Sequence, residues 1–254
     1  MTVANDFVIT PPMKANLFQT LWVFLRSAGI MIDICSRAVW KSLTKTTSRA
    51  WVDQAAHNWA ARLVKAARIK VTVFNPHNVD FHASRPMVVM CNHTSLYDIP
   101  LSFAAVPGSL RMLAKKELSN VPFMGQGMKA AEFLFVDRNN RKQAFKDMEI
   151  VKEKMESGII VWIAPEGTRS KTGKLGPFKK GAFLTAMDAK ALIIPIGIRG
   201  ANTVMPPKTW QLWLDQPAEV HIGEPIDTAE YSSKTRDELI ERVRLSILEL
   251  SGQA

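Results

Sequence analysis

The sequence predicts an α/β fold, in which a mixed, largely parallel sheet of about seven strands is flanked by helices. Short runs of β-branched or apolar residues recur from Ile69 onward, and segments with helical periodicity alternate with several of them. Before Ile69 the chain instead shows two long helical patterns. Because alternating strands and helices bury a sheet between helical layers, we expect residues 1–68 to form an N-terminal helical unit and residues 69–254 to form the α/β domain.

The composition supports a globular protein with a basic surface. Of 254 residues, 47% are hydrophobic and 22% are charged, and the net charge is +10. This surplus favours anionic partners, namely nucleic acid, anionic lipid headgroups or phosphorylated substrates, without choosing among them. Cys35 and Cys91 lack metal-type spacing, which indicates a reducing compartment. The N-terminus carries Asp6 and lacks the basic-then-apolar layout of a signal peptide, so we expect no export.

The first predicted helix covers about residues 15–41 and is amphipathic. Its longest uncharged run, Ala15 to Leu25, is 11 residues, short of the ~20 that a membrane-spanning helix needs. Trp22 and Trp40 fit interfacial anchors of a helix that lies in a membrane surface, and packing on the protein's own core is the alternative. A polar stripe and an apolar face lie roughly opposite each other: the stripe holds Gln19, Arg26, Asp33 and Arg37, and the face holds Leu17, Leu21, Phe24, Met31 and Cys35.

A second helix is predicted at about residues 48–68, and we expect it to pair with the first in antiparallel fashion. Its two faces differ in polarity: Val52, Ala55, Ala56, Trp59 and Leu63 share one face, and Arg49, Asp53, Arg62 and Lys65 share the other.

The predicted strands are the apolar runs at 69–74, 86–91, 111–114, 133–136, 159–163, 192–198 and 218–222. Pro195 lacks an amide hydrogen, so it is expected to place its strand at a sheet edge or to introduce a bulge.

Two more helices complete the pattern. One is capped by Asn139 or Asn140 and ends at Gly158, with an inward face formed by Ala144, Met148, Val151 and Met155. The last helix opens with Thr235 and Glu238 as a capping box, and its inward face holds Leu239, Ile240, Val243 and Ile247.

The stretch "CNHTSLYDIP" presents His93 and Asp98 directly after a buried strand. Carboxyl ends of strands are where α/β folds usually hold their sites. Residues five apart diverge by about 140° on a helix, so one helical face does not join them. A strand, a tight turn and a helix start would instead fold Asp98 against the imidazole, fixing its tautomer and leaving the other ring nitrogen as a base. The alternative is a capping aspartate beside an incidental surface histidine.

The stretch "PEGTRS" follows another strong strand and offers the elements of an anion site. It supplies a glycine for close backbone approach, a hydroxyl, and the guanidinium of Arg169, which suits bidentate phosphate binding. A merely basic loop is the alternative. The spacing of Gly167 and Gly173, with Leu175 in place of Ser or Thr, excludes a nucleotide-binding P-loop. Lys116 and Arg138 also come close to predicted strand ends and could converge on one anion.

Taken in order, "NHTSLYD", "FLFVDR", "PEGTRS" and "IIPIGI" resemble the four signature blocks of the glycerolipid acyltransferase family. The likeness is greatest to its bacterial 1-acyl-sn-glycerol-3-phosphate acyltransferase branch, and it spans Asn92 to Ile198. Residues before Ile69 resemble the family's two-helix membrane-docking motif by character only. Ala164 departs from the phenylalanine that many members carry before "PEGTR".

The resemblance implies a glycerol-3-phosphate acyltransferase-like fold and a role for each residue. His93 would be the general base for the sn-2 hydroxyl of lysophosphatidic acid, and Asp98 would orient it. Arg169 would hold the acceptor phosphate with Lys116 and Arg138, in a site shaped by Glu166, Gly167 and Thr168. The acyl donor would be acyl-CoA or acyl-carrier protein, with no cofactor and no metal. The methionines could line an adaptable acyl pocket or fill the core. A monotopic or peripheral position on the cytoplasmic face of the inner membrane is expected.

Three rival functions remain at this stage. A related acyltransferase could act on another lysophospholipid or on glycerol 3-phosphate. A nucleic-acid-binding domain would interleave aromatic residues with its lysines, but Phe178 is the one aromatic residue between Lys171 and Lys180, so we expect no nucleic-acid partner. A non-catalytic lipid-binding relative is disfavoured by the intact His93 and Asp98.

Overall fold

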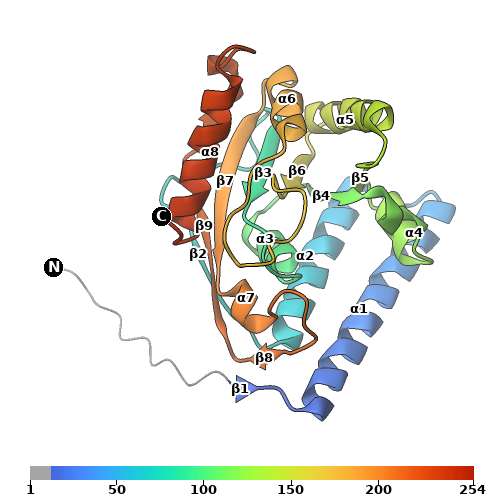
Figure 1. Ribbon diagram of the computed structural model, residues 1–254. Coiled ribbons are helices and arrows are strands. Elements are labelled where there is room, and N and C mark those ends of the chain that lie inside the picture. Colours follow the sequence, from blue (N-terminus) through green and yellow to red (C-terminus); the bar gives the residue numbers. More distant parts are fainter. Residues whose placement is uncertain (1–12) are drawn as a thin grey trace.

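The computed structural model describes residues 13–254 and consists of a sheet covered by helices on both faces (Figure 1). The expectation about Asp6 lies outside the described residues. The strands are β1 (Met13–Lys14), β2 (Lys70–Phe74), β3 (Met87–Cys91), β4 (Leu110–Lys115), β5 (Leu134–Val136), β6 (Ile160–Ile163), β7 (Leu192–Arg199), β8 (Trp213–Leu214), β9 (Pro217–Ile222) and β10 (Ile226–Asp227). The helices are α1 (Leu17–Leu43), α2 (Arg49–Ala66), α3 (Asp98–Ala105), α4 (Met124–Ala130), α5 (Arg141–Glu156), α6 (Lys180–Asp188), α7 (Ala201–Val204) and α8 (Arg236–Leu250), with 3₁₀ turns η1 (Lys116–Asn120) and η2 (Thr228–Glu230).

The main sheet runs in the order β2-β9-β7-β3-β6-β4-β5, and β10 adds to β7. All neighbours pair in parallel except β7 with β9 and β7 with β10. The predicted mixed, largely parallel sheet of about seven strands is therefore confirmed. The short strands β1, β8 and β10 were not predicted, because two residues carry no readable periodicity.

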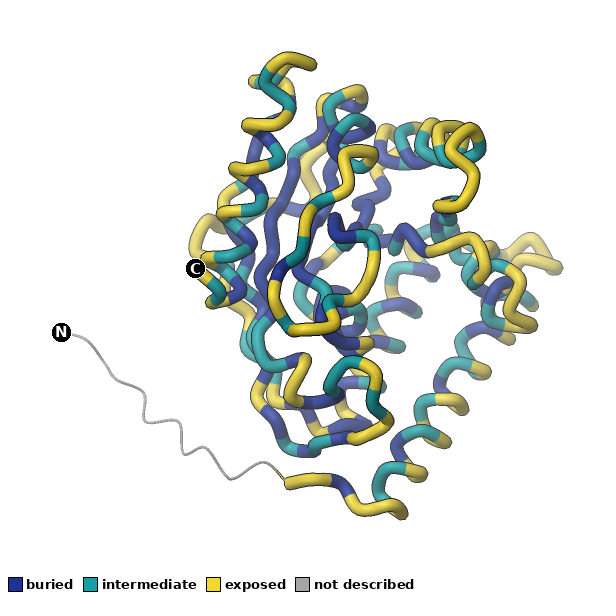
Figure 2. Tube along the Cα trace, in the orientation of Figure 1, coloured by how far each residue is buried: buried dark blue, intermediate teal, exposed yellow. Residues whose placement is uncertain are grey.

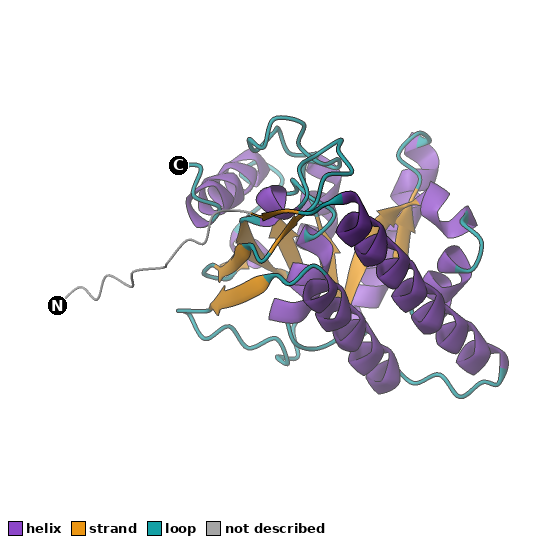
Figure 3. Cartoon of the chain, turned by 90° about the horizontal axis from the view of Figure 1, so that it is seen from below, coloured by secondary structure: helices purple, strands orange, loops and turns teal. Residues whose placement is uncertain are grey.

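Two apolar layers pack on opposite faces of the sheet, and the buried residues concentrate along its strands (Figure 2). On one face Val89, Trp162 and Ile194 meet α2 and α3. On the other face, the adjacent residues Val88, Val161 and Ile193 meet α5, α6 and α8. This alternation is what the period of a β-strand imposes. Figure 3 shows the strands between these helices from below.

The predicted edge position for Pro195 is wrong, because β7 lies inside the sheet between β3 and β9. Pro195 falls where the antiparallel partner of β7 changes from β9, which ends at Ile222, to β10, which begins at Ile226. Its carbonyl accepts from Gly223 N at 2.9 Å. The missing amide hydrogen therefore coincides with an interruption of the ladder, which is why an interior strand tolerates the proline.

The two predicted helix starts have different outcomes. Asn140 caps α5 as expected, since its side chain accepts from Gln143 N at 3.1 Å. The predicted capping box of α8 is wrong: Thr235 occupies the cap position, but it makes no side-chain cap hydrogen bond. Its hydroxyl instead accepts from Ser232 N at 2.9 Å, within the preceding turn. A local turn thus competed successfully for the same hydroxyl.

Helices α1 and α2 run antiparallel, and α1 lies against α4 at the periphery of the molecule (Figure 1). Both alternatives for α1 apply, because the helix has two apolar faces. Val23, Ile30, Cys35 and Ala38 are buried. The outer face is exposed and holds Phe18, Leu21, Trp22, Leu25, Ile32, Trp40 and Leu43. By length and composition this 27-residue helix could also cross a membrane.

Candidate active site

The candidate site lies at one edge of the sheet. Strands β3, β6, β4 and β5 are successive parallel neighbours, so their carboxyl ends meet at the same edge. His93 follows β3 and "PEGTRS" follows β6, while Lys116 follows β4 and Arg138 comes shortly after β5. The sheet order thus brings together segments that are far apart in the sequence, at the position where α/β sheets usually bind ligands.

His93 and Asp98 are in direct contact. His93 Nδ1 lies 2.8 Å from Asp98 Oδ2, and the same oxygen accepts from Thr94 N at 2.6 Å and Ser95 N at 2.7 Å. Asp98 begins α3 and is fully buried, so its side chain folds back over the turn that precedes the helix. An ionised carboxylate only accepts hydrogen bonds, and therefore Nδ1 carries the hydrogen and Nε2 is free to act as a base.

The imidazole is also held from its side. The rings of His93 and Trp162 pack edge to face, with centroids 5.7 Å apart. Trp162 Nε1 donates to Ser102 Oγ at 2.8 Å, and Ser102 Oγ donates to Asp98 O at 2.8 Å. These buried contacts fix the ring plane as well as the tautomer.

The loop after β6 grips the backbone of His93. Glu166 is buried, and it accepts from His93 N at 3.3 Å and from Gly176 N at 2.8 Å. Ser170 N donates to the His93 carbonyl at 2.7 Å. Burial raises the pKa of Glu166, and the two amides oppose that rise. The Glu166 side chain therefore points toward the histidine turn and not toward solvent.

The predicted cations lie at the same edge but are exposed. Arg138 donates to Gly167 O, which links the segment after β5 to the "PEGTRS" loop. Lys116 Nζ contacts Asp137 Oδ2 at 3.1 Å, and this hydrogen bond lowers the pKa of Asp137. Within residues 13–254 no hydrogen bond or ion pair occupies the side chain of Arg169, which is exposed. Thr168, beside it, is also exposed. Arg169 is thus a guanidinium without a protein partner in the described chain.

Two features escaped the sequence reasoning. Asn92 is buried, and its amide donates to Ile198 O at 2.9 Å and accepts from Ile198 N at 2.8 Å. It thereby extends the pairing of β3 with β7 up to His93. A polar residue at the end of a buried strand was the available signal, but its partner lies too far away in the sequence to be inferred.

The second feature is an apolar cavity of about 420 Å³ between α1, α2 and α4. Leu96 and Tyr97, which lie between His93 and Asp98, form part of its wall. The cavity therefore reaches the histidine turn. Burial raises the pKa of Tyr97 to about 12, so its hydroxyl stays neutral beside the cavity. Several methionines line it, namely Met31, Met112, Met124, Met128 and Met205.

Sequence and structure comparisons agree with one another. A family model described as Acyltransferase matches residues 70–199. The 1-acyl-sn-glycerol-3-phosphate acyltransferase of Saccharomyces cerevisiae is 33% identical over 64% of this chain and 57% of its own length. The human 1-acyl-sn-glycerol-3-phosphate acyltransferase alpha is 32% identical over 71% of this chain and 63% of its own. The match thus covers less than two thirds of either relative.

A solved structure has the same fold. The crystal structure of the 1-acyl-sn-glycerophosphate (LPA) acyltransferase PlsC from Thermotoga maritima superimposes with a TM-score of 0.76. It is 24% identical, and the match covers 93% of this chain and 95% of that one.

Proposed function

Since the chain belongs to the acyltransferase family, we propose that it transfers a fatty acyl group from an acyl thioester to the sn-2 hydroxyl of 1-acylglycerol 3-phosphate. The observation that carries the proposal is the contact of His93 Nδ1 with the buried Asp98 at 2.8 Å. It leaves Nε2 as a base at the carboxyl end of β3. The names of the yeast and human relatives support lysophosphatidic acid as the acceptor.

In the proposed mechanism, His93 Nε2 takes the proton of the acceptor hydroxyl as the oxygen attacks the thioester carbonyl. Asp98 stabilises the imidazolium that forms. The proton then passes to the departing thiolate, so the products are the two-chain lipid and the free thiol. A positioned base of this kind contributes about 10²–10⁴-fold to the rate. The acceptor supplies the nucleophile, and no nucleophilic side chain is required.

The exposed cations provide the proposed phosphate site. Arg169 is the primary ligand because its guanidinium has no protein partner in the described chain. Arg138 and Lys116 stand at the neighbouring strand ends as helpers, with Gly167 and Thr168 forming the loop. Glu166 is proposed to hold the loop against His93, since its oxygens accept from His93 N and Gly176 N.

The apolar cavity is the proposed site of a fatty acyl chain. Its volume of about 420 Å³ lies within the usual range for small-molecule sites. Leu96 and Tyr97 connect it to the histidine turn. A chain in this cavity would bring its carboxyl end close to His93.

We also propose that the exposed face of α1 contacts the membrane that carries the acceptor. Trp22 and Trp40 suit the interfacial region, and the apolar side chains between them suit the acyl layer. The surplus of basic residues favours the anionic cytoplasmic leaflet. A monotopic or peripheral position on that face follows from this arrangement.

One assay tests the proposed activity. Protein in detergent or vesicles is given lysophosphatidic acid with acyl-CoA or acyl-carrier protein, and thiol release and phosphatidic acid are measured. We expect turnover by the unmodified protein and almost none by His93→Ala. Turnover by a folded His93→Ala protein at the unmodified rate would exclude the mechanism.

The same assay tests the phosphate site and the acceptor. Arg169→Ala is expected to raise the KM for the acceptor and to leave the KM for the acyl donor unchanged. An effect on the donor alone would reassign Arg169 to the donor site. Glycerol 3-phosphate and lysophospholipids with larger headgroups, offered beside lysophosphatidic acid, test which acceptor is preferred.

A further inference from the structure

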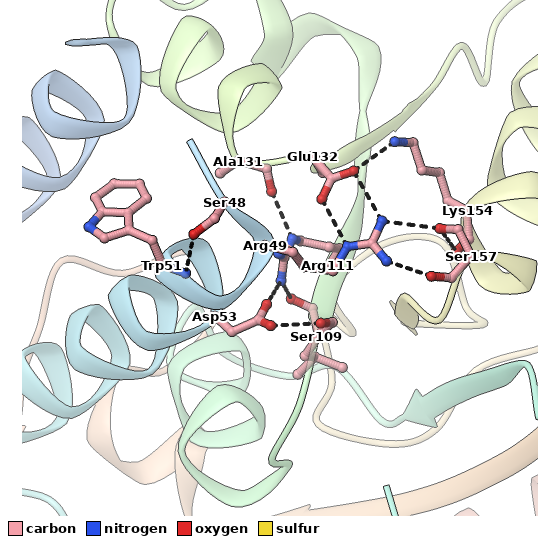
Figure 4. Close-up of polar contacts among 11 residues, drawn as sticks. Ser48, Arg49, Trp51, Asp53, Ser109, Arg111, Ala131, Glu132, Lys154 and Ser157 are labelled. Carbon is pink, nitrogen blue, oxygen red and sulfur yellow. Dashed lines mark hydrogen bonds and ion pairs between the residues drawn. The ribbon is translucent and has the colours of Figure 1, made fainter. Parts of the chain in front are cut away.

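A fully buried arginine connects opposite walls of the apolar cavity (Figure 4). Arg111 Nη1 lies 2.8 Å from Asp53 Oδ1 in α2, and Arg111 Nε donates to Ala131 O, directly after α4, at 2.7 Å. Ala131 itself lines the cavity, as do Val52 beside Asp53 and Met112 beside Arg111. One side chain on β4 therefore joins the α2 wall to the α4 wall.

The surrounding contacts make this connection rigid. Ser109 Oγ donates to Asp53 Oδ2 at 2.7 Å, and Arg111 Nη1 also donates to Leu110 O at 2.9 Å. The other terminal nitrogen of Arg111, Nη2, has no hydrogen-bond partner within the described residues 13–254. Burial lowers the pKa of the Arg111 guanidinium, and Asp53 opposes that effect.

Stability alone does not account for such a group. A buried ion pair with an unsatisfied nitrogen loses much of its attraction to desolvation, and an apolar side chain of similar volume is often as stable or more so. What an arginine adds is geometry, because its planar fork can hold two acceptors at fixed positions. A single lysine ammonium has no such fork.

We propose that Arg111 is a positioning residue that sets the width of the acyl cavity, and thereby the choice of acyl-chain length. The inference rests on the proposed function, which supplies the acyl chain as the occupant. Arg111 belongs to the wall support, whereas His93 and Asp98 belong to the histidine turn. Loss of Arg111 is therefore expected to change which chain is used more than how fast a well-bound chain reacts.

The test is a profile of kcat and KM over acyl-CoA donors of 10 to 20 carbons, with lysophosphatidic acid held constant. Discrimination between neighbouring chain lengths in a fitted pocket is worth roughly 10-fold or more per methylene. Arg111→Met and Asp53→Asn should reduce the ratio of kcat/KM between preferred and disfavoured chains by about 5-fold or more, mainly through KM. Arg111→Lys keeps the charge opposite Asp53 and should restore part of the ratio.

Asp227→Asn is the matched control, because it breaks another arginine–aspartate pair, Arg85 with Asp227, away from the cavity. Its profile should follow that of the unmodified protein. An unchanged profile in folded Arg111→Met or Asp53→Asn, or an equal change in Asp227→Asn, would overturn the proposal. If Arg111→Met does not fold, Asp53→Asn and Arg111→Lys decide.

A second arm needs no turnover. Binding of cis-parinaric acid, a fluorescent 18-carbon fatty acid, should weaken about 5-fold or more in Asp53→Asn relative to Asp227→Asn. Absence of turnover in the unmodified protein would refute the proposed function, whereas equal binding by these two variants would refute the role of Arg111.

Discussion

Asp98→Asn tests how the carboxylate acts on His93. One oxygen, Oδ2, accepts from His93 Nδ1, Thr94 N and Ser95 N, while Oδ1 is buried and has no hydrogen-bond partner within residues 13–254. An asparagine therefore orients its carbonyl oxygen at the Oδ2 position, because its NH₂ group would face two amide hydrogens there. The imidazole keeps its tautomer, and the variant loses only the negative charge.

The size of the effect follows from that charge. Two unit charges about 4 Å apart interact by about 4 kcal/mol at an effective dielectric constant of about 20. A barrier raised by that amount corresponds to a loss of about 10³-fold in kcat. Asp98→Ala removes the hydrogen bonds as well as the charge, so its activity should fall below that of Asp98→Asn, toward that of His93→Ala.

The assay is thiol release at saturating acceptor and donor, with circular dichroism of each variant as the folding control. The reasoning is refuted if folded Asp98→Asn is as inactive as His93→Ala, since the tautomer would then have reversed. It is equally refuted if Asp98→Asn retains more than about a tenth of the unmodified kcat.

Three further predictions concern stability and location. Burial disfavours the charge on Glu132, but hydrogen bonds from two cations outweigh it and lower its pKa to about 2; because a lowered carboxyl pKa stabilises the fold above the unfolded value near 4.3, the loss of melting temperature in Glu132→Gln should be full above about pH 5 and shrink toward pH 2, and a pH-independent loss would contradict this. Asn92→Ala leaves a buried amide and a buried carbonyl unpaired, so denaturant unfolding should show a loss of about 2–5 kcal/mol, and a loss below about 1 kcal/mol would be inconsistent with the two bonds. Leu25→Glu on the exposed face of α1 should release the protein from membranes under mild salt, whereas Leu245→Glu on α8 should remain bound until carbonate treatment; equal release of both would argue against docking through α1.

Local features explain why much of the site could be predicted. The five-residue spacing of His93 and Asp98 is bridged by one strand end, one turn and one helix start, all encoded within ten residues. The same holds for Asn140 at the start of α5. Thr235 shows the limit of such reasoning, because two local hydrogen-bonding patterns competed for one hydroxyl and the sequence pattern did not rank them.

Contacts between distant segments were not predictable in this way. Pro195 was assigned to an edge because the strand order was unknown, and only the arrival of β9 and β10 on β7 shows how an interior strand accommodates it. Glu166 was expected to shape a phosphate site, yet its carboxylate supports the backbone of His93. In each case the decisive partner lies far away in the sequence.

The sequence by itself determined the α/β architecture, the pairing of His93 with Asp98 and the row of cations at the strand ends, because periodicity and short spacing are local properties. The tertiary structure alone decided which edge those ends share, that α1 has one buried and one exposed apolar face, and that Arg111 joins two walls of a cavity. These features depend on how separate elements pack, and the balance of burial and desolvation between them is fixed only when the chain is folded.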